Sequence, residues 1–168
     1  MTPMRPITYS PITVLLASPD KPMALARRRH QLTRMWGGLA NMEQADQPTP
    51  DDWRVCSDAV NLVETLVRHG GGHWRDCDGD LVHITDERGL LDDAVTALGQ
   101  AGERAMAGKP LRLDAAGIQA VRAVLEDYAS LLDALPERTI VAAHRVTEKR
   151  IRAILAGKTH THDVVVDF

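Results

Sequence analysis

The sequence has few cysteines and no long hydrophobic run. Cys56 and Cys77 are the two cysteines among its 168 residues, which is too few for a disulfide framework in a chain of this size. The short apolar run at residues 12–17 falls far below the roughly 20 residues that cross a bilayer. No charged segment with a cleavage site precedes it. We therefore expect a protein of the reducing cytoplasm that has no membrane span.

Recognisable catalytic motifs are also missing. The sequence contains no P-loop and no dinucleotide fingerprint. His69-Gly70-Gly71-Gly72 imitates the oxyanion loop of some esterases, but no Gly-x-Ser-x-Gly elbow supplies a nucleophile for it. A helix end followed by a loop explains these glycines better. Because no motif supports catalysis, we expect a non-catalytic protein without a cofactor.

The composition is that of a globular domain. Hydrophobic residues make up 44% of the chain, charged residues 26%, and the formal net charge is -3. These values lie near globular averages, and the length suits one domain. The net charge gives no global attraction to nucleic acid or to anionic lipid. We expect an extended proline-containing arm at 1–21, a helical domain at 22–158, and a tail or short strand at 159–168.

Proline placement and apolar spacing predict the secondary structure. Residues 1–21 hold four of the nine prolines, which favours an extended arm or one edge strand and argues against a helix. Helical spacing follows in five segments. We expect helices at 22–43, from Thr49-Pro50 to Gly70, from a cap at Thr85 or Asp86 to Gly108, from a cap at Asp114 to Pro136, and from Pro136 to Gly157.

The faces of these helices define the expected fold class. The segment after Pro50 has an apolar inner line, while Asn61 and Thr65 belong to its polar side. Amphipathic helices with short connections bury their apolar faces most simply as antiparallel neighbours. The expected fold class is mainly α, a bundle of about five helices.

A small β-hairpin insert is predicted at about 73–84. Asp78-Gly79 lies between short segments that contain Trp74 and residues 81–84, which is a recognised hairpin signal. Asp76, Asp78 and Asp80 superficially suggest a calcium loop, but the glycine falls at the fourth position and not at the sixth. We expect a solvated acidic tip that could serve as a partner surface.

Histidines and a cysteine surround this hairpin. Zinc needs about four converging ligands, and the candidates are His69, His73, Cys77 and His83. His69 and His73 would share a helix face only if the helix continued through three glycines. We therefore expect solvent-facing histidines and no metal site, and zinc binding is the less favoured alternative.

Charge is segregated along the chain. Residues 21–34 hold five basic residues and no acid, and residues 137–158 hold six basic residues against two acids, whereas residues 76–103 hold eight acids. Basic faces of the first and last helices could bind phosphates. The candidate residues are Arg27, Arg28, Arg29, Arg34, Arg145, Lys149, Arg150 and Arg152. The alternative is that these charges lie on solvated faces or pair with acids, as Glu148 and Arg152 can at a spacing of four residues.

Several segments resemble small helical proteins of β-proteobacterial phages and integrated elements. The similar stretches are residues 26–35, 49–55 and 113–122, together with His144-Arg145 and residues 147–151. No activity is attached to that group. The resemblance therefore implies a biological setting and assigns no site residues.

These observations favour a binding protein. We expect it to act through protein-protein contacts, as a regulator or inhibitor of a host defence complex. A homodimer is expected because the N-terminal arm could exchange between two copies. The alternative is a nucleic-acid-binding protein that uses the two basic faces. A metal-binding or enzymatic protein is the third reading.

Overall fold

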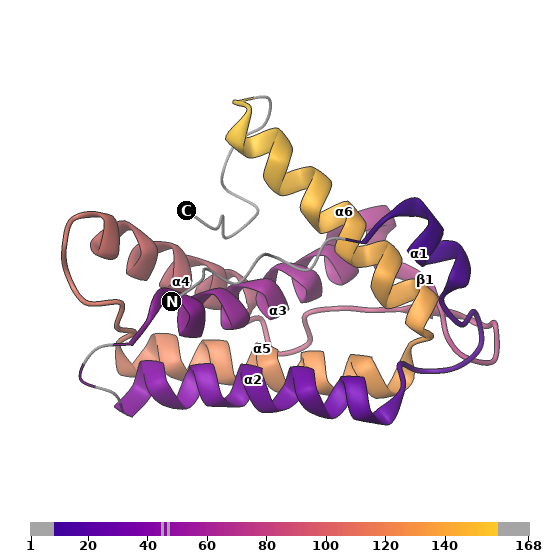
Figure 1. Ribbon diagram of the computed structural model, residues 1–168, viewed down its shortest axis with the longest axis horizontal. Helices are drawn as coiled ribbons and strands as arrows, with labels where there is room; N and C mark the ends of the chain where they lie inside the picture. Colours follow the sequence, from indigo (N-terminus) through magenta and orange to yellow (C-terminus); the bar gives the residue numbers. More distant parts are fainter. Residues whose placement is uncertain (1–8, 45, 47, 158–168) are drawn as a thin grey trace.

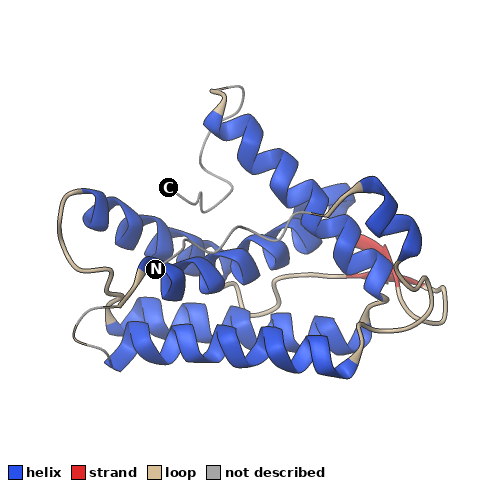
Figure 2. Ribbon diagram, in the orientation of Figure 1, coloured by secondary structure: helices blue, strands red, loops and turns tan. Residues whose placement is uncertain are grey.

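The fold is mainly α-helical, with one small antiparallel sheet, in the computed structural model shown in Figures 1 and 2. The structure describes residues 9–44, 46 and 48–157. The described elements are α1 (Pro11–Leu16), α2 (Leu25–Gln44), α3 (Pro50–Arg68), the 3-10 turn η1 (His69–Gly72), β1 (His73–Arg75), β2 (Leu81–His83), α4 (Leu91–Met106), α5 (Ala115–Ala134) and α6 (Glu137–Leu155). The predicted fold class, mainly α with a hairpin, is confirmed. The predicted tail at 159–168 and residues 1–8 of the predicted arm lie outside the described residues.

Helix α3 is the central helix. Helices α2, α4, α5 and α6 all pack against it, and α2 and α5 lie side by side along one edge of the molecule (Figure 1). Leu62 and Leu66 of the apolar side of α3 are fully buried, and they belong to one core with Leu39 and Met42 of α2, Leu98 of α4 and Leu125 of α5. Among the described residues, none of the helices combines the length and the apolar character that a bilayer crossing requires.

A capping box starts α3, as its sequence predicts. The Thr49 hydroxyl accepts the Asp52 amide at 3.2 Å, and the Asp52 carboxylate accepts the Thr49 amide at 2.8 Å. Pro50 occupies the first helical position, where no amide hydrogen is needed. These local bonds satisfy two amides that would otherwise have no partner.

Replacing Thr49 with alanine tests this cap. The substitution removes the acceptor of the Asp52 amide, so we expect the free energy of unfolding to fall by about 1 kcal/mol. Urea denaturation followed by circular dichroism measures the change. Thr49→Ser keeps the hydroxyl and serves as the control, which should stay close to the parent. Equal losses in the two variants would contradict a role for the hydroxyl bond.

The prediction that residues 1–21 contain no helix is wrong, because α1 covers Pro11–Leu16. Ser10 caps this helix by accepting the Thr13 amide at 3.2 Å. Pro11 stands in the first turn, where a proline preorganises a helix and does not break it. The number of prolines in residues 1–21 predicted an extended chain, although Ser10-Pro11 is a local signal for a helix start.

The predicted start of the third helix at Thr85 or Asp86 is also wrong. Helix α4 begins at Leu91, after a turn in which Gly89 has a φ of +64°. Asp86 still supplies acceptors for the helix start from the preceding loop. Its carboxylate accepts the amides of Leu90 and Leu91 at 3.3 and 3.0 Å. Asp86 therefore supports the helix start from the preceding loop, whereas the N-cap position itself is Leu90.

The hairpin forms where it was predicted. β1 and β2 pair antiparallel, with His73 opposite His83 and Trp74 opposite Val82. Asp76 closes the connecting loop, because its carboxylate accepts the amides of Asp78 and Asp80 at 2.9 Å. The Trp74 indole donates to the Leu66 carbonyl at 2.6 Å, which anchors the hairpin to the end of α3.

Candidate functional site

A row of polar side chains on α3 is buried inside the fold. Ser57, Asn61, Glu64 and Thr65 follow one another at helical spacing, and each is 0% exposed. The prediction that Asn61 and Thr65 face the polar outside is therefore wrong. Helix α6 crosses this side of α3 (Figure 1) and makes direct contacts to Thr65. As a result, α3 is covered on its polar side as well as on its apolar side.

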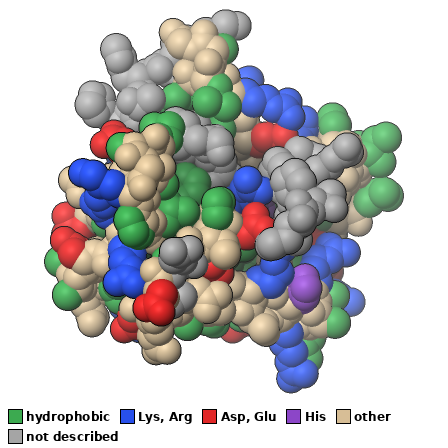
Figure 3. All heavy atoms as spheres, turned by 60° about the vertical axis from the view of Figure 1, so that its left-hand side comes forward, with side chains coloured by type: hydrophobic (Ala, Val, Ile, Leu, Met, Phe, Trp, Pro, Cys, Tyr) green, Lys and Arg blue, Asp and Glu red, His purple; other side chains and the backbone are tan. Residues whose placement is uncertain are grey.

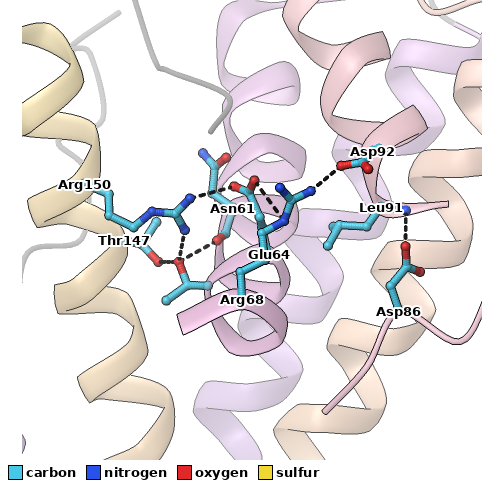
Figure 4. Close-up of polar contacts among 9 residues, drawn as sticks. Asn61, Glu64, Arg68, Asp86, Leu91, Asp92, Thr147 and Arg150 are labelled. Atoms are coloured by element: carbon cyan, nitrogen blue, oxygen red, sulfur yellow. Dashed lines mark hydrogen bonds and ion pairs between the residues drawn. The ribbon is translucent and has the colours of Figure 1, made fainter. Parts of the chain in front are cut away.

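Two threonines join α3 to α6 at this crossing. The hydroxyls of Thr65 and Thr147 lie 2.7 Å apart. Each also lies 3.0 Å from a carbonyl one turn earlier in its own helix, that of Asn61 or that of Ala143. Arg150 donates to the Thr65 hydroxyl at 3.1 Å (Figure 4). The hydroxyls are thus bonded to each other, to backbone and to a guanidinium.

Charged groups extend the same cluster across three helices. The Glu64 carboxylate lies 3.6 Å from the guanidinium of Arg150 on α6 and 3.6 Å from that of Arg68 on α3. Arg68 in turn pairs with Asp92 of α4 (Figure 4). Charges of opposite sign therefore alternate from α6 through α3 to α4. This arrangement joins α6, α3 and α4 through charged side chains.

Four of the eight predicted phosphate-binding residues are engaged in ion pairs. Arg27 pairs with Glu137, Arg28 with Asp133 at 2.6 Å, and Arg152 with Glu148, while Arg150 belongs to the cluster on α3. Arg29, Arg145 and Lys149 are exposed, and Arg34 is half-buried.

Several basic side chains are gathered in one area of the face shown in Figure 3. Figure 3 shows several Lys and Arg side chains around a histidine at the lower right, and mixed charges elsewhere on that face. The ion pairs with acids lower the positive potential that α2 and α6 can offer to a phosphate backbone.

The histidines of the hairpin do not meet as a metal site. The rings of His73 and His83 stack with centroids 4.7 Å apart, while His69 lies against Trp74 at 6.0 Å. Across the described part of the chain, no three His, Cys, Asp or Glu side chains are placed to hold one metal ion. The three histidines are exposed, as predicted.

The predicted acidic surface is divided by the turn. Asp78 and Asp80 are exposed, whereas the carboxylate of Asp76 is engaged with backbone amides. Cys77 donates to the Ala134 carbonyl at 3.6 Å. Its partial burial, followed by the nearby charges of Asp76 and Asp78, raises the pKa of the thiol.

Helix α1 rests on α6 and turns an apolar face outward. Arg138 of α6 donates to the Leu15 carbonyl at 3.2 Å, and the Tyr9 ring lies 5.3 Å from that of His144. Burial lowers the pKa of His144 to about 4 and keeps the ring neutral at this contact. These contacts with Tyr9 and α6 leave the opposite side of α1 exposed.

The outward face of α1 consists of Ile12, Leu15 and Leu16, which we name the α1 face. Their spacing of three and four residues puts them on one side of the helix. They are 65, 73 and 80% exposed, and no residue of α1 is buried. The apolar run at residues 12–17 is visible in the sequence, but the helical face that it forms was not predicted. The signal was available as Ser10-Pro11 followed by helical spacing.

Comparisons with family models, curated proteins and solved structures found no match to this chain.

Proposed function

We propose that this protein is a non-catalytic binding protein that holds a protein partner on the α1 face. The observation that carries the proposal is the gathering of three large, mostly exposed apolar side chains on one side of α1. Contiguous exposed apolar surface marks interaction sites, whereas apolar residues scattered singly are ordinary. The other strongly exposed large apolar residues described are single and lie on different elements: Leu25, Leu81, Met106 and Leu155.

The attachment of α1 suits a recognition element. Backbone bonds tie the segment after α1 to the start of α6, since Ser18 and Lys21 carbonyls accept the amides of Arg138 and Glu137 at 2.9 and 2.8 Å. A short helix held in this way presents its side chains in one orientation, which lowers the entropic cost of binding. The resemblance to phage and mobile-element proteins supports a host complex as the target, with this protein as its regulator or inhibitor.

The test is affinity capture from host lysate, with quantitative mass spectrometry, of partners held by the parent and by Leu15→Ser/Leu16→Ser. Exposed side chains contribute little to stability, so we expect the double variant to keep the parent's circular dichroism and melting temperature. We expect it to lose at least nine-tenths of the specifically captured partner, because apolar anchors dominate interface energies. Nuclease treatment of the lysate removes capture through bridging nucleic acid.

Leu81→Ser is the control, since Leu81 is another strongly exposed leucine and lies on the hairpin. This control should retain the partner. The proposal fails if the parent captures nothing above a tag-only resin. It also fails if Leu81→Ser and the α1 double variant retain the partner equally.

A further inference from the structure

A cavity opens on the side of the molecule where α3, α4 and α5 meet the segment after β2. It has a volume of about 370 Å³, which lies within the range of roughly 300 to 1,000 Å³ that is usual for small-ligand sites. It is separate in sequence and in structural elements from the α1 face. The following inference therefore does not depend on the proposed function.

The cavity has an apolar wall and a charged rim. Val63 and Val67 of α3, Val124 and Leu131 of α5, and Leu91 of α4 supply the wall. The charged side chains that line it are Asp86, Glu87, Arg88 and Asp127. Such a lining suits a ligand with an aliphatic part and a polar end.

Arg88 already pairs with acids at the rim. Its guanidinium lies 2.7 Å from Glu126 and 3.5 Å from Asp127, so it reaches from the loop before α4 to α5. Asp127 thus already forms an ion pair with a cation of the same chain. Because Arg88 is nearly half exposed, solvent can replace its contacts at moderate cost.

Negative charge exceeds positive charge at this rim. Three acids line the cavity, Asp86, Glu87 and Asp127, against one arginine. Glu126, which pairs with Arg88 at 2.7 Å, adds negative charge beside the rim. Burial raises the pKa of Asp127, as do the charges of Asp86, Glu126 and Glu87, although Arg88 opposes them. A second cation near Asp127 would therefore be attracted.

We propose that this cavity binds an alkylguanidinium or alkylammonium group, with its aliphatic chain against the apolar wall and its cationic end at Asp127. The ligand is the side chain of an arginine or lysine in a partner, or a free amine of the same chemistry. A metal ion fits less well, because the described carboxylates are not grouped closely enough to hold one.

Titration of isotope-labelled protein with acetyl-arginine amide tests the proposal by methyl NMR. We expect the methyl signals of Val67, Val124 and Leu131 to shift in a saturable way. Acetyl-citrulline amide has nearly the same shape without the charge, and it should bind at least tenfold more weakly. Butylguanidine is the probe for a free small-molecule cation. Tighter binding of the capped amino acid identifies a partner side chain, and tighter binding of butylguanidine identifies a free ligand.

Two variants give opposite expected results. Asp127→Asn should weaken binding of the arginine probe at least tenfold, while Arg88→Ala should tighten it at least threefold because the competing cation is gone. Asp93→Asn, an exposed acid of α4 that does not line the cavity, should leave binding unchanged.

The proposal is overturned if the arginine probe shifts no cavity methyl at millimolar concentration. Equal binding of the citrulline probe would overturn it too, as would weaker binding by Arg88→Ala. Each of these outcomes concerns the cavity alone, so each is distinguishable from failure of capture through the α1 face.

Discussion

Replacing Gly72 with alanine is expected to remove roughly 2 to 5 kcal/mol from the free energy of unfolding. Gly72 has a φ of +74°, a conformation that side chains with a Cβ rarely adopt. A Cβ built there would lie 2.4 Å from the Ile84 carbonyl and 2.8 Å from the Val67 carbonyl. Both neighbours are backbone atoms, and the Gly72 carbonyl itself accepts the Ile84 amide at 2.8 Å. Chemical denaturation in urea measures the loss.

Gly70→Ala separates the two causes of this loss. Gly70 also has a positive φ, of +61°, but a Cβ there would meet nothing within 4 Å. Its substitution should therefore cost only the conformational part, about 1 kcal/mol. If the two alanine variants lose the same stability, the close approach of α3, Gly72 and the end of β2 is wrong.

The elements that sequence predicted best are those with a complete local signal. Thr49, Pro50 and Asp52 stand next to one another, and the bonds that start α3 join only these neighbours. The same holds for the hairpin, where Asp76 and Gly79 build the turn from within five residues. A local pattern predicts such features because no distant residue is needed to form them.

The features that sequence missed depend on distant partners. Periodicity separated the two sides of α3, but it could not show that α6, more than eighty residues later, covers Thr65 with Thr147. For the same reason, the sequence could not show which basic residues are paired with acids and which are not. Arg27 and Arg28 point to acids more than one hundred positions away, at Asp133 and Glu137, and charge counting along the chain cannot reveal those pairs.

Glu64→Gln is expected to destabilise the protein by roughly 2 to 4 kcal/mol, because it removes the negative centre shared by Arg68 and Arg150. The Glu64 side chain is 0% exposed, whereas the side chains of Arg68 and Arg150 are 36 and 25% exposed, which moderates the loss. Hydrogen exchange should show where stability is lost. The amides of α6 should exchange faster while those of α2 keep their protection, since the cluster ties α6 to α3.

Glu148→Gln is the matched control, because Glu148 pairs with Arg152 on the surface of the same helix α6. That exposed pair is separated by four residues, so its loss should cost no more than about 0.5 kcal/mol. A double-mutant cycle with Arg150→Gln isolates the interaction across the helix crossing, and we expect a coupling above about 1 kcal/mol between positions 64 and 150. If Glu64→Gln costs no more than Glu148→Gln, the buried carboxylate does not hold α6 in place, and the crossing rests on the threonine pair and apolar contacts instead.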